Sequence, residues 1–115
     1  MQLIDSHCHL DVSDFSTDLT ETLKRGQEAG VVAFVVPAID NASWPHLSEL
    51  ATKHIEVKPA YGLHPMFLEQ FEPSHLEALP DWLAKPECVA VGECGLDFFI
   101  PDFDSALQEL VFIEH

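Results

Sequence analysis

Basic residues are scarce in this chain. Five lysines and arginines stand against 20 aspartates and glutamates in 115 residues, which gives a formal net charge of −15. Such an acidic surface repels nucleic acids and anionic membranes at long range. A phosphate-bearing substrate would therefore need to be held locally, most simply through bound cations. A second interpretation is that the acid excess only keeps the protein soluble.

Cysteine and long apolar runs are scarce as well. The three cysteines form no CxxC pair and their number is odd, which argues against a disulfide framework and favours a reducing compartment. No apolar run approaches the ~20 residues that a membrane span needs. Asp5, His7, His9 and Asp11 interrupt any apolar stretch that a signal peptide would require. We expect a soluble, cytoplasmic protein that does not contact membranes.

Apolar segments alternate with amphipathic ones along the chain. Expected strands cover 2–5, 31–37, 57–62 and 88–92, and expected helices cover 16–29, 41–54, 74–84 and 107–115. Such a βαβα order predicts an α/β fold in which helices cover parallel strands, as a doubly wound sheet or as a barrel. In both architectures functional residues gather at the carboxyl ends of the strands.

Local signals refine the boundaries of these helices. Ser16 or Thr17 is the expected N-cap of the first helix, and Gly30 is expected to end it. Ser74 and Glu77 have the spacing of a capping box for the third helix. Pro80 is expected to kink or divide that helix.

Residues that can do chemistry follow all four expected strands. They are His7 and His9 after the first, Asp40 and Asn41 after the second, His64 in GLHP after the third and Glu93 in GECGLD after the fourth. On a strand, side chains at i and i+2 point to the same face, so the two imidazoles of HxH can reach one cation. Neutral imidazole nitrogen suits Zn²⁺, Mn²⁺ or Fe²⁺, and Glu93 is the natural carboxylate partner.

Structural explanations compete with this metal site. His7 and His9 could be a hydrogen-bonded pair in the core, His64 a turn residue before Pro65, and Asp97 a cap of the following segment. Asp5 and Asp11 fit better as groups that orient imidazoles than as ligands. Four apolar residues near the end of the chain are expected to pack in the core rather than to stack on bases: Phe98, Phe99, Ile100 and Phe103.

Four stretches together resemble the TatD family of metal-dependent hydrolases, known as TatD-related deoxyribonucleases. They are IDSHCHLD at 4–11, VVPAID at 35–40, YGLHP at 61–65 and VGECGLDFF at 91–99. The resemblance implies a (β/α)₈ TIM barrel that hydrolyses phosphodiester or related ester bonds with one or two divalent metal ions, such as Zn, Mg or Mn. It implies that His7 and His9 bind one metal and that the catalytic carboxylate of Glu93 bridges two. His64 and Asp97 would lie beside the substrate or behind the ligands.

The length of the chain limits what the resemblance implies. A complete barrel takes ~250 residues, whereas 1–115 supplies about four βα units, the N-terminal part of such a barrel. The family's other ligands, two histidines and an aspartate, come from later strands. An open sheet would expose its edges, so we expect a homo-oligomer. Three functions stay open: a deoxyribonuclease acting on DNA or another phosphate ester, an amidohydrolase-like enzyme acting on a small ester or amide, and a catalytically incompetent metal-binding fragment.

Overall fold

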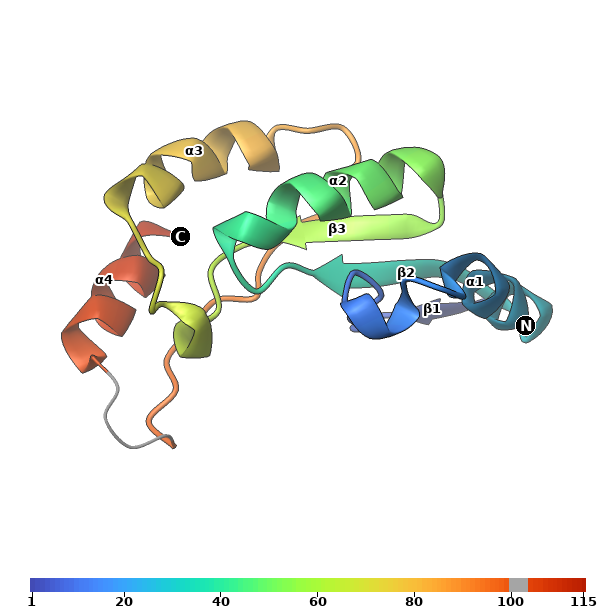
Figure 1. The fold of residues 1–115 in the computed structure, drawn as a ribbon, viewed down its shortest axis with the longest axis horizontal. Coiled ribbons are helices and arrows are strands. Elements are labelled where there is room, and N and C mark those ends of the chain that lie inside the picture. Colours follow the sequence, from blue (N-terminus) through green and yellow to red (C-terminus); the bar gives the residue numbers. More distant parts are fainter. Residues whose placement is uncertain (100–103) are drawn as a thin grey trace.

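A single parallel sheet organises the chain, for which the computed structural model describes residues 1–99 and 104–115. Its strands are β1 (Leu3–Asp5), β2 (Val31–Pro37), β3 (Val57–Tyr61) and β4 (Ala90–Val91), in the order β1-β2-β3-β4. The helices are α1 (Leu19–Glu28), α2 (Trp44–Lys53), α3 (Pro73–Leu83) and α4 (Ser105–Glu114). Three short 3₁₀ turns, η1 (Ser13–Phe15), η2 (Asn41–Ser43) and η3 (Pro65–Phe67), follow the first three strands. Figure 1 shows these elements.

This topology confirms the predicted parallel α/β fold and favours one of its two forms. Each strand lies beside the strand that precedes it in the chain, without the reversal of order that a doubly wound sheet requires. Sequential addition of βα units is how a barrel is built. Because every strand runs in the same direction, the loops after β1, β2, β3 and β4 meet at one edge of the sheet.

The core lies between the sheet and its helices. Phe34 and Val36 of β2 are buried, and they pack with Trp44 and Leu47 of α2 and with Tyr61 of β3. The opposite face of β2 is less covered in this chain, since Val35 is only half-buried. A cavity of about 320 Å³ opens on that side, lined by Val35, Pro37, Ala60 and Val91 among others.

Two of the predicted helix caps are wrong. α1 begins at Leu19 after Asp18, because Ser16 lies in the preceding turn, where its hydroxyl donates to the Ser13 carbonyl at 2.6 Å. The capping box of α3 is formed by Glu72 and His75 instead of Ser74 and Glu77. Pro73 explains the difference. Proline is favoured at the first position of a helix because it has no N–H that would need a partner there, so the residue before it, Glu72, becomes the N-cap.

Two other boundary predictions have different outcomes. Gly30 follows α1 with φ +99°, a left-handed conformation that suits glycine, so the predicted end of this helix is confirmed. Pro80 does not divide α3, which continues through it to Leu83. Its position one turn from the end of the helix, on the exposed side, leaves little helix to interrupt. Among the described residues, no helix is long and apolar enough to cross a membrane.

Candidate metal centre

His7 and His9 lie in the loop that leaves β1, two and four residues beyond the end of the strand. This loop bends at His7 and is held to β2 by the Cys8 amide, which donates to the Val35 carbonyl at 3.1 Å. Asp5 adds a second restraint by accepting a hydrogen bond from the His7 backbone amide at 3.2 Å. The two histidines do not lie on the strand itself, and their imidazoles converge from the loop with 79° between the ring planes.

Glu93 comes from the other edge of the sheet, directly after β4. The Gly92 amide donates to the Tyr61 carbonyl at 3.0 Å, and the Glu93 amide donates to the Ala38 carbonyl at 3.4 Å. These bonds hold the loop against the ends of β2 and β3. Residues from opposite edges of a four-stranded sheet meet here, which requires that the sheet curves between β1 and β4.

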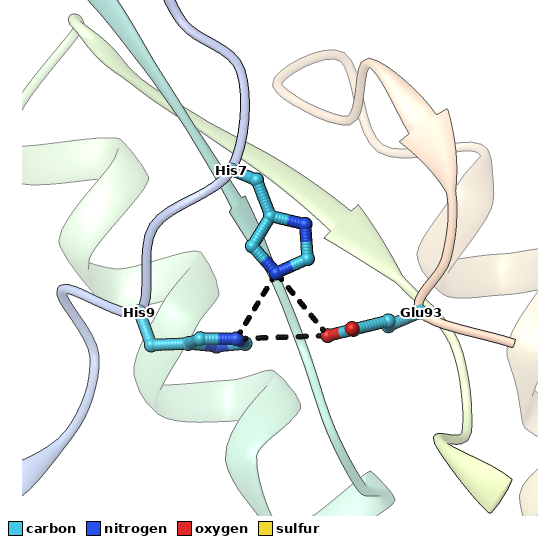
Figure 2. A group of neighbouring side chains, drawn as sticks. All are labelled: His7, His9 and Glu93. Atoms are coloured by element: carbon cyan, nitrogen blue, oxygen red, sulfur yellow. Dashed lines mark hydrogen bonds and ion pairs between the residues drawn. The ribbon is translucent and has the colours of Figure 1, made fainter. Parts of the chain in front are cut away.

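The side chains of these three residues converge on one point (Figure 2). Nε2 of His7 and Nε2 of His9 are 3.2 Å apart, and each lies 3.6 Å from Oε2 of Glu93. The three atoms define a triangle whose centre is about 2.0 Å from each, close to the ~2.0–2.2 Å of zinc–nitrogen and zinc–oxygen bonds. Two imidazoles and one carboxylate are ligands that Zn²⁺ and Mn²⁺ accept.

Burial of the carboxylate supports the same interpretation. Oε2 of Glu93 is buried and has no hydrogen-bond partner. An unpaired carboxylate oxygen that is removed from water costs free energy unless a cation or a donor compensates it. A cation between the three side chains would compensate it, so the residues present fit a divalent metal.

His64 approaches the other oxygen of the same carboxylate. Its Nε2 lies 3.6 Å from Oε1 of Glu93, and its Nδ1 accepts a hydrogen bond from the Met66 amide at 3.0 Å. Because Nδ1 must be unprotonated to accept, Nε2 carries the proton in the neutral ring. His64 therefore faces Glu93 as a donor and not as a metal ligand.

Cys8, between the two histidines, lies outside the group of three side chains. Burial raises the pKa of this thiol to about 12, with the charges of Asp5 and Asp11 adding to the effect. The thiolate is the form that binds metals, so near neutral pH Cys8 is a neutral side chain, with its sulfur 3.7 Å from the Val35 carbonyl. Burial also raises the pKa of Asp11, whose Oδ1 is buried and unpaired.

The remaining predicted site residues have other contacts. Asp97 lies outside the group of three, and its Oδ1 accepts a hydrogen bond from the Phe99 amide at 2.8 Å. The side chain of Asp5 holds the His7 backbone rather than an imidazole. Phe98 and Phe99 are 58% and 94% exposed, so the prediction that they pack in the core is wrong. Ile100 and Phe103 lie outside the described residues.

A cleft of about 260 Å³ adjoins the three ligands. His9, His64 and Glu93 form part of its wall, and the rest is apolar: Val12, Ile39 and Phe67. Phe67 of η3 packs edge-on against the His64 ring, with 5.3 Å between the ring centroids. A small group could therefore reach His9 and Glu93 from an apolar surface.

The family model for TatD-related DNases matches residues 4–115. The chain belongs to this family. Among curated TatD relatives it is 39% identical over 103 residues to an Escherichia coli K12 protein named "Uncharacterized metal-dependent hydrolase YjjV", with 88% of this chain and 40% of that protein covered. It is 31% identical over 118 residues to the similarly named YcfH of the same organism, with 100% of this chain and 44% of YcfH covered.

A solved TatD structure supports the fold directly. The crystal structure of E. coli YjjV matches with a TM-score of 0.91 and 37% identity, over 97% of this chain and 44% of that one. The sheet is therefore part of a TIM barrel, as the resemblance implied. The chain spans about two fifths of the length of the TatD relatives that it matches.

Sequence reasoning missed Gln108 of α4. Among the described residues it is the one buried polar side chain, with 2% exposure. Its amide contacts the backbone of Asp97 and of Pro65, next to two of the predicted site residues. Only its position at helical spacing beside Val111 could have indicated burial, and that pattern is more typical of an apolar residue.

Proposed function

We propose that this chain carries a metal-dependent hydrolase centre that cleaves phosphate esters, with DNA as the substrate. The observation that carries the proposal is the triangle of His7, His9 and Glu93, whose three donor atoms surround a position fitting one divalent cation. Support for the substrate class comes from the family, whose model is described as TatD-related DNase. The metal-dependent names of the relatives support the cofactor.

Each of the four side chains has a distinct task in this proposal. His7 and His9 bind the cation through neutral Nε2, and Glu93 supplies a negative charge through Oε2. A bound divalent cation polarises a phosphoryl oxygen and lowers the pKa of a water ligand. His64 presents Nε2–H toward the same space, where it can donate to Glu93 or to a substrate oxygen.

The charge balance explains why a cation is needed. A net charge of −15 repels a polyanionic substrate, and Glu93 adds a carboxylate at the centre itself. With neutral imidazoles, the three ligands carry one negative charge, so one divalent cation makes the site net positive. Local attraction for a phosphate then opposes the long-range repulsion.

Hydrolysis of an activated phosphodiester tests the proposal. The chain is incubated with bis(p-nitrophenyl) phosphate and Mn²⁺, Mg²⁺ or Zn²⁺, in parallel with a DNA oligonucleotide and with p-nitrophenyl acetate. We expect metal-dependent release of nitrophenolate from the phosphodiester and cleavage of the oligonucleotide, both lost in His7→Ala and in Glu93→Gln. His54→Ala, which removes a histidine after the end of α2, is the matched control and should keep the activity.

Each other outcome changes the assignment. Turnover that survives His7→Ala would show that the proposed ligands are not the catalytic centre. A larger rate enhancement over the uncatalysed reaction for the acetate than for both phosphodiesters, lost in His7→Ala, would favour an amidohydrolase-like enzyme. Metal binding without any turnover would contradict hydrolysis by this chain and favour the non-catalytic metal-binding fragment.

A further inference from the structure

Gln108 of α4 uses both ends of its side-chain amide to bind backbone. Oε1 accepts a hydrogen bond from the Asp97 amide at 2.8 Å, while Nε2 donates to the Asp97 carbonyl at 3.0 Å and lies 3.4 Å from the Pro65 carbonyl. The side-chain amide thus bonds both the N–H and the C=O of Asp97, as the backbone of a neighbouring strand would. Because Gln108 is 2% exposed, water does not replace these partners when they are lost.

The two segments that Gln108 joins are the ones that carry His64 and Glu93. Pro65 directly follows His64, and Asp97 lies four residues after Glu93 in the same loop. Nε2 of His64 and Oε1 of Glu93 are 3.6 Å apart. Among the described residues, the side-chain amide of Gln108 joins these two positions, since its Nε2 reaches the carbonyls of both Pro65 and Asp97.

The helix that carries Gln108 is itself anchored. Val111, three residues further along α4, is buried in the core at 2% exposure. Asp104 caps the start of the helix by accepting from the Leu107 amide at 2.9 Å. At the other end, Nε2 of His115 accepts from the Leu63 amide at 2.9 Å. α4 is therefore a fixed support for Gln108, and it lies beside η3 (Figure 1).

We propose that Gln108 is a positioning residue for the metal centre. It fixes the separation of the two loops, and thereby the direction in which His64 holds the Glu93 carboxylate. With Oε1 of Glu93 turned to His64, Oε2 is left facing His7 and His9. This inference rests on the proposed metal centre, because the property that Gln108 would change is the affinity of that centre for its cation.

Gln108→Glu is the sharpest variant. It keeps the acceptor for the Asp97 amide but turns a carboxylate oxygen toward the carbonyls of Asp97 and Pro65, which repel it. We expect Zn²⁺ affinity to fall about 10- to 100-fold, the range typical for groups that orient metal ligands. Gln70→Glu adds the same charge at an exposed position and should bind Zn²⁺ as the wild type does. Gln108→Met, of similar length, removes the hydrogen bonds without adding a charge. Its Zn²⁺ affinity should lie between those of Gln108→Glu and Gln70→Glu.

Two readouts separate positioning from a general loss of fold. Far-UV circular dichroism establishes that each variant folds. The imidazole nitrogen shifts of His64, measured by long-range ¹H–¹⁵N NMR without metal, should move in both Gln108 variants and stay fixed in Gln70→Glu. Unchanged His64 shifts in folded Gln108 variants would overturn the inference, whether or not metal binds. A wild type that binds no Zn²⁺ would instead refute the proposed function, because the NMR result does not depend on the cation.

Discussion

Replacing Gly62 by alanine should weaken cation binding through the backbone alone. A Cβ atom at Gly62 would lie 2.6 Å from the carbonyl carbon of Gly92, 2.7 Å from its oxygen and 3.0 Å from the amide nitrogen of Glu93. These are main-chain atoms, so no side chain can rotate away. Restoring ordinary contact, from 2.6 Å to at least 3.4 Å, moves the loop of Glu93 by about 0.8 Å relative to β3.

The magnitude follows from that displacement. Overpacking of this kind costs about 1–3 kcal/mol in the free energy of unfolding. At the proposed metal centre, Oε2 of Glu93 lies 3.6 Å from each imidazole nitrogen, and moving it about 0.8 Å further away would place the three atoms too far apart to lie all within ~2.2 Å of one cation. We expect Zn²⁺ affinity to fall at least 10-fold, as it does when a group that orients a ligand is lost.

Two measurements on two variants test this. Urea unfolding gives the stability, and titration against a chromophoric chelator gives the Zn²⁺ affinity. Gly26→Ala is the matched control, because its Cβ would meet the end of the Phe34 ring at 2.5 Å, in the core and away from the site. Gly26→Ala should change stability and leave affinity unchanged. An affinity for Zn²⁺ in Gly62→Ala equal to that of the wild type would refute the reasoning.

Three further outcomes are expected. Burial raises the pKa of Tyr61 to about 12. The neutral side chain therefore stabilises the fold below pH ~10, where tyrosine in the unfolded chain is still neutral, and this stabilisation is lost as the pH rises through ~12. Tyr61→Phe removes a buried hydroxyl that has no hydrogen-bond partner. This variant should lose less stability at alkaline pH, while its free energy of unfolding at pH 7 should change by under about 1 kcal/mol. Urea unfolding at pH 7 and at alkaline pH would show both effects. Trp44→Phe should cost about 1–2 kcal/mol in the same assay, since it breaks the 3.1 Å bond from Nε1 to the Gly62 carbonyl and removes part of a fully buried ring. Ile4 and Val89 are 64% and 53% exposed near the two edges of the sheet, so the chain should self-associate. The double variant Ile4→Lys, Val89→Lys should weaken this association at least 10-fold, as measured by sedimentation velocity. A purely monomeric wild type at micromolar concentration would contradict the last expectation.

The parallel strands and the grouping of His7, His9 and Glu93 at one edge of the sheet could be predicted, because the runs that form strands are short-range patterns. A buried run such as VVAFVVP indicates a strand, and parallel strands bring their carboxyl ends together whatever the helices between them do. His7, His9 and Glu93 could therefore be grouped from positions that are far apart in the sequence. The resemblance to TatD hydrolases gave the barrel, which alternation by itself left open.

Contacts that depend on tertiary structure could not be predicted. Ser16 and Ser74 have good capping chemistry, but the turn before α1 and Pro73 at the start of α3 decided the actual caps. Gln108 looks in the sequence like one polar residue on an amphipathic helix, and its burial depends on two loops that meet only in the fold. The tautomer of His64 likewise depends on a backbone amide two residues away.

A calorimetric Zn²⁺ titration of the chain tests whether His7, His9 and Glu93 together hold one divalent cation. We expect one ion per chain at saturation, with binding lost in His7→Ala and in Glu93→Gln and kept in His54→Ala. Absence of binding by the wild type, or binding that persists in His7→Ala, would contradict it.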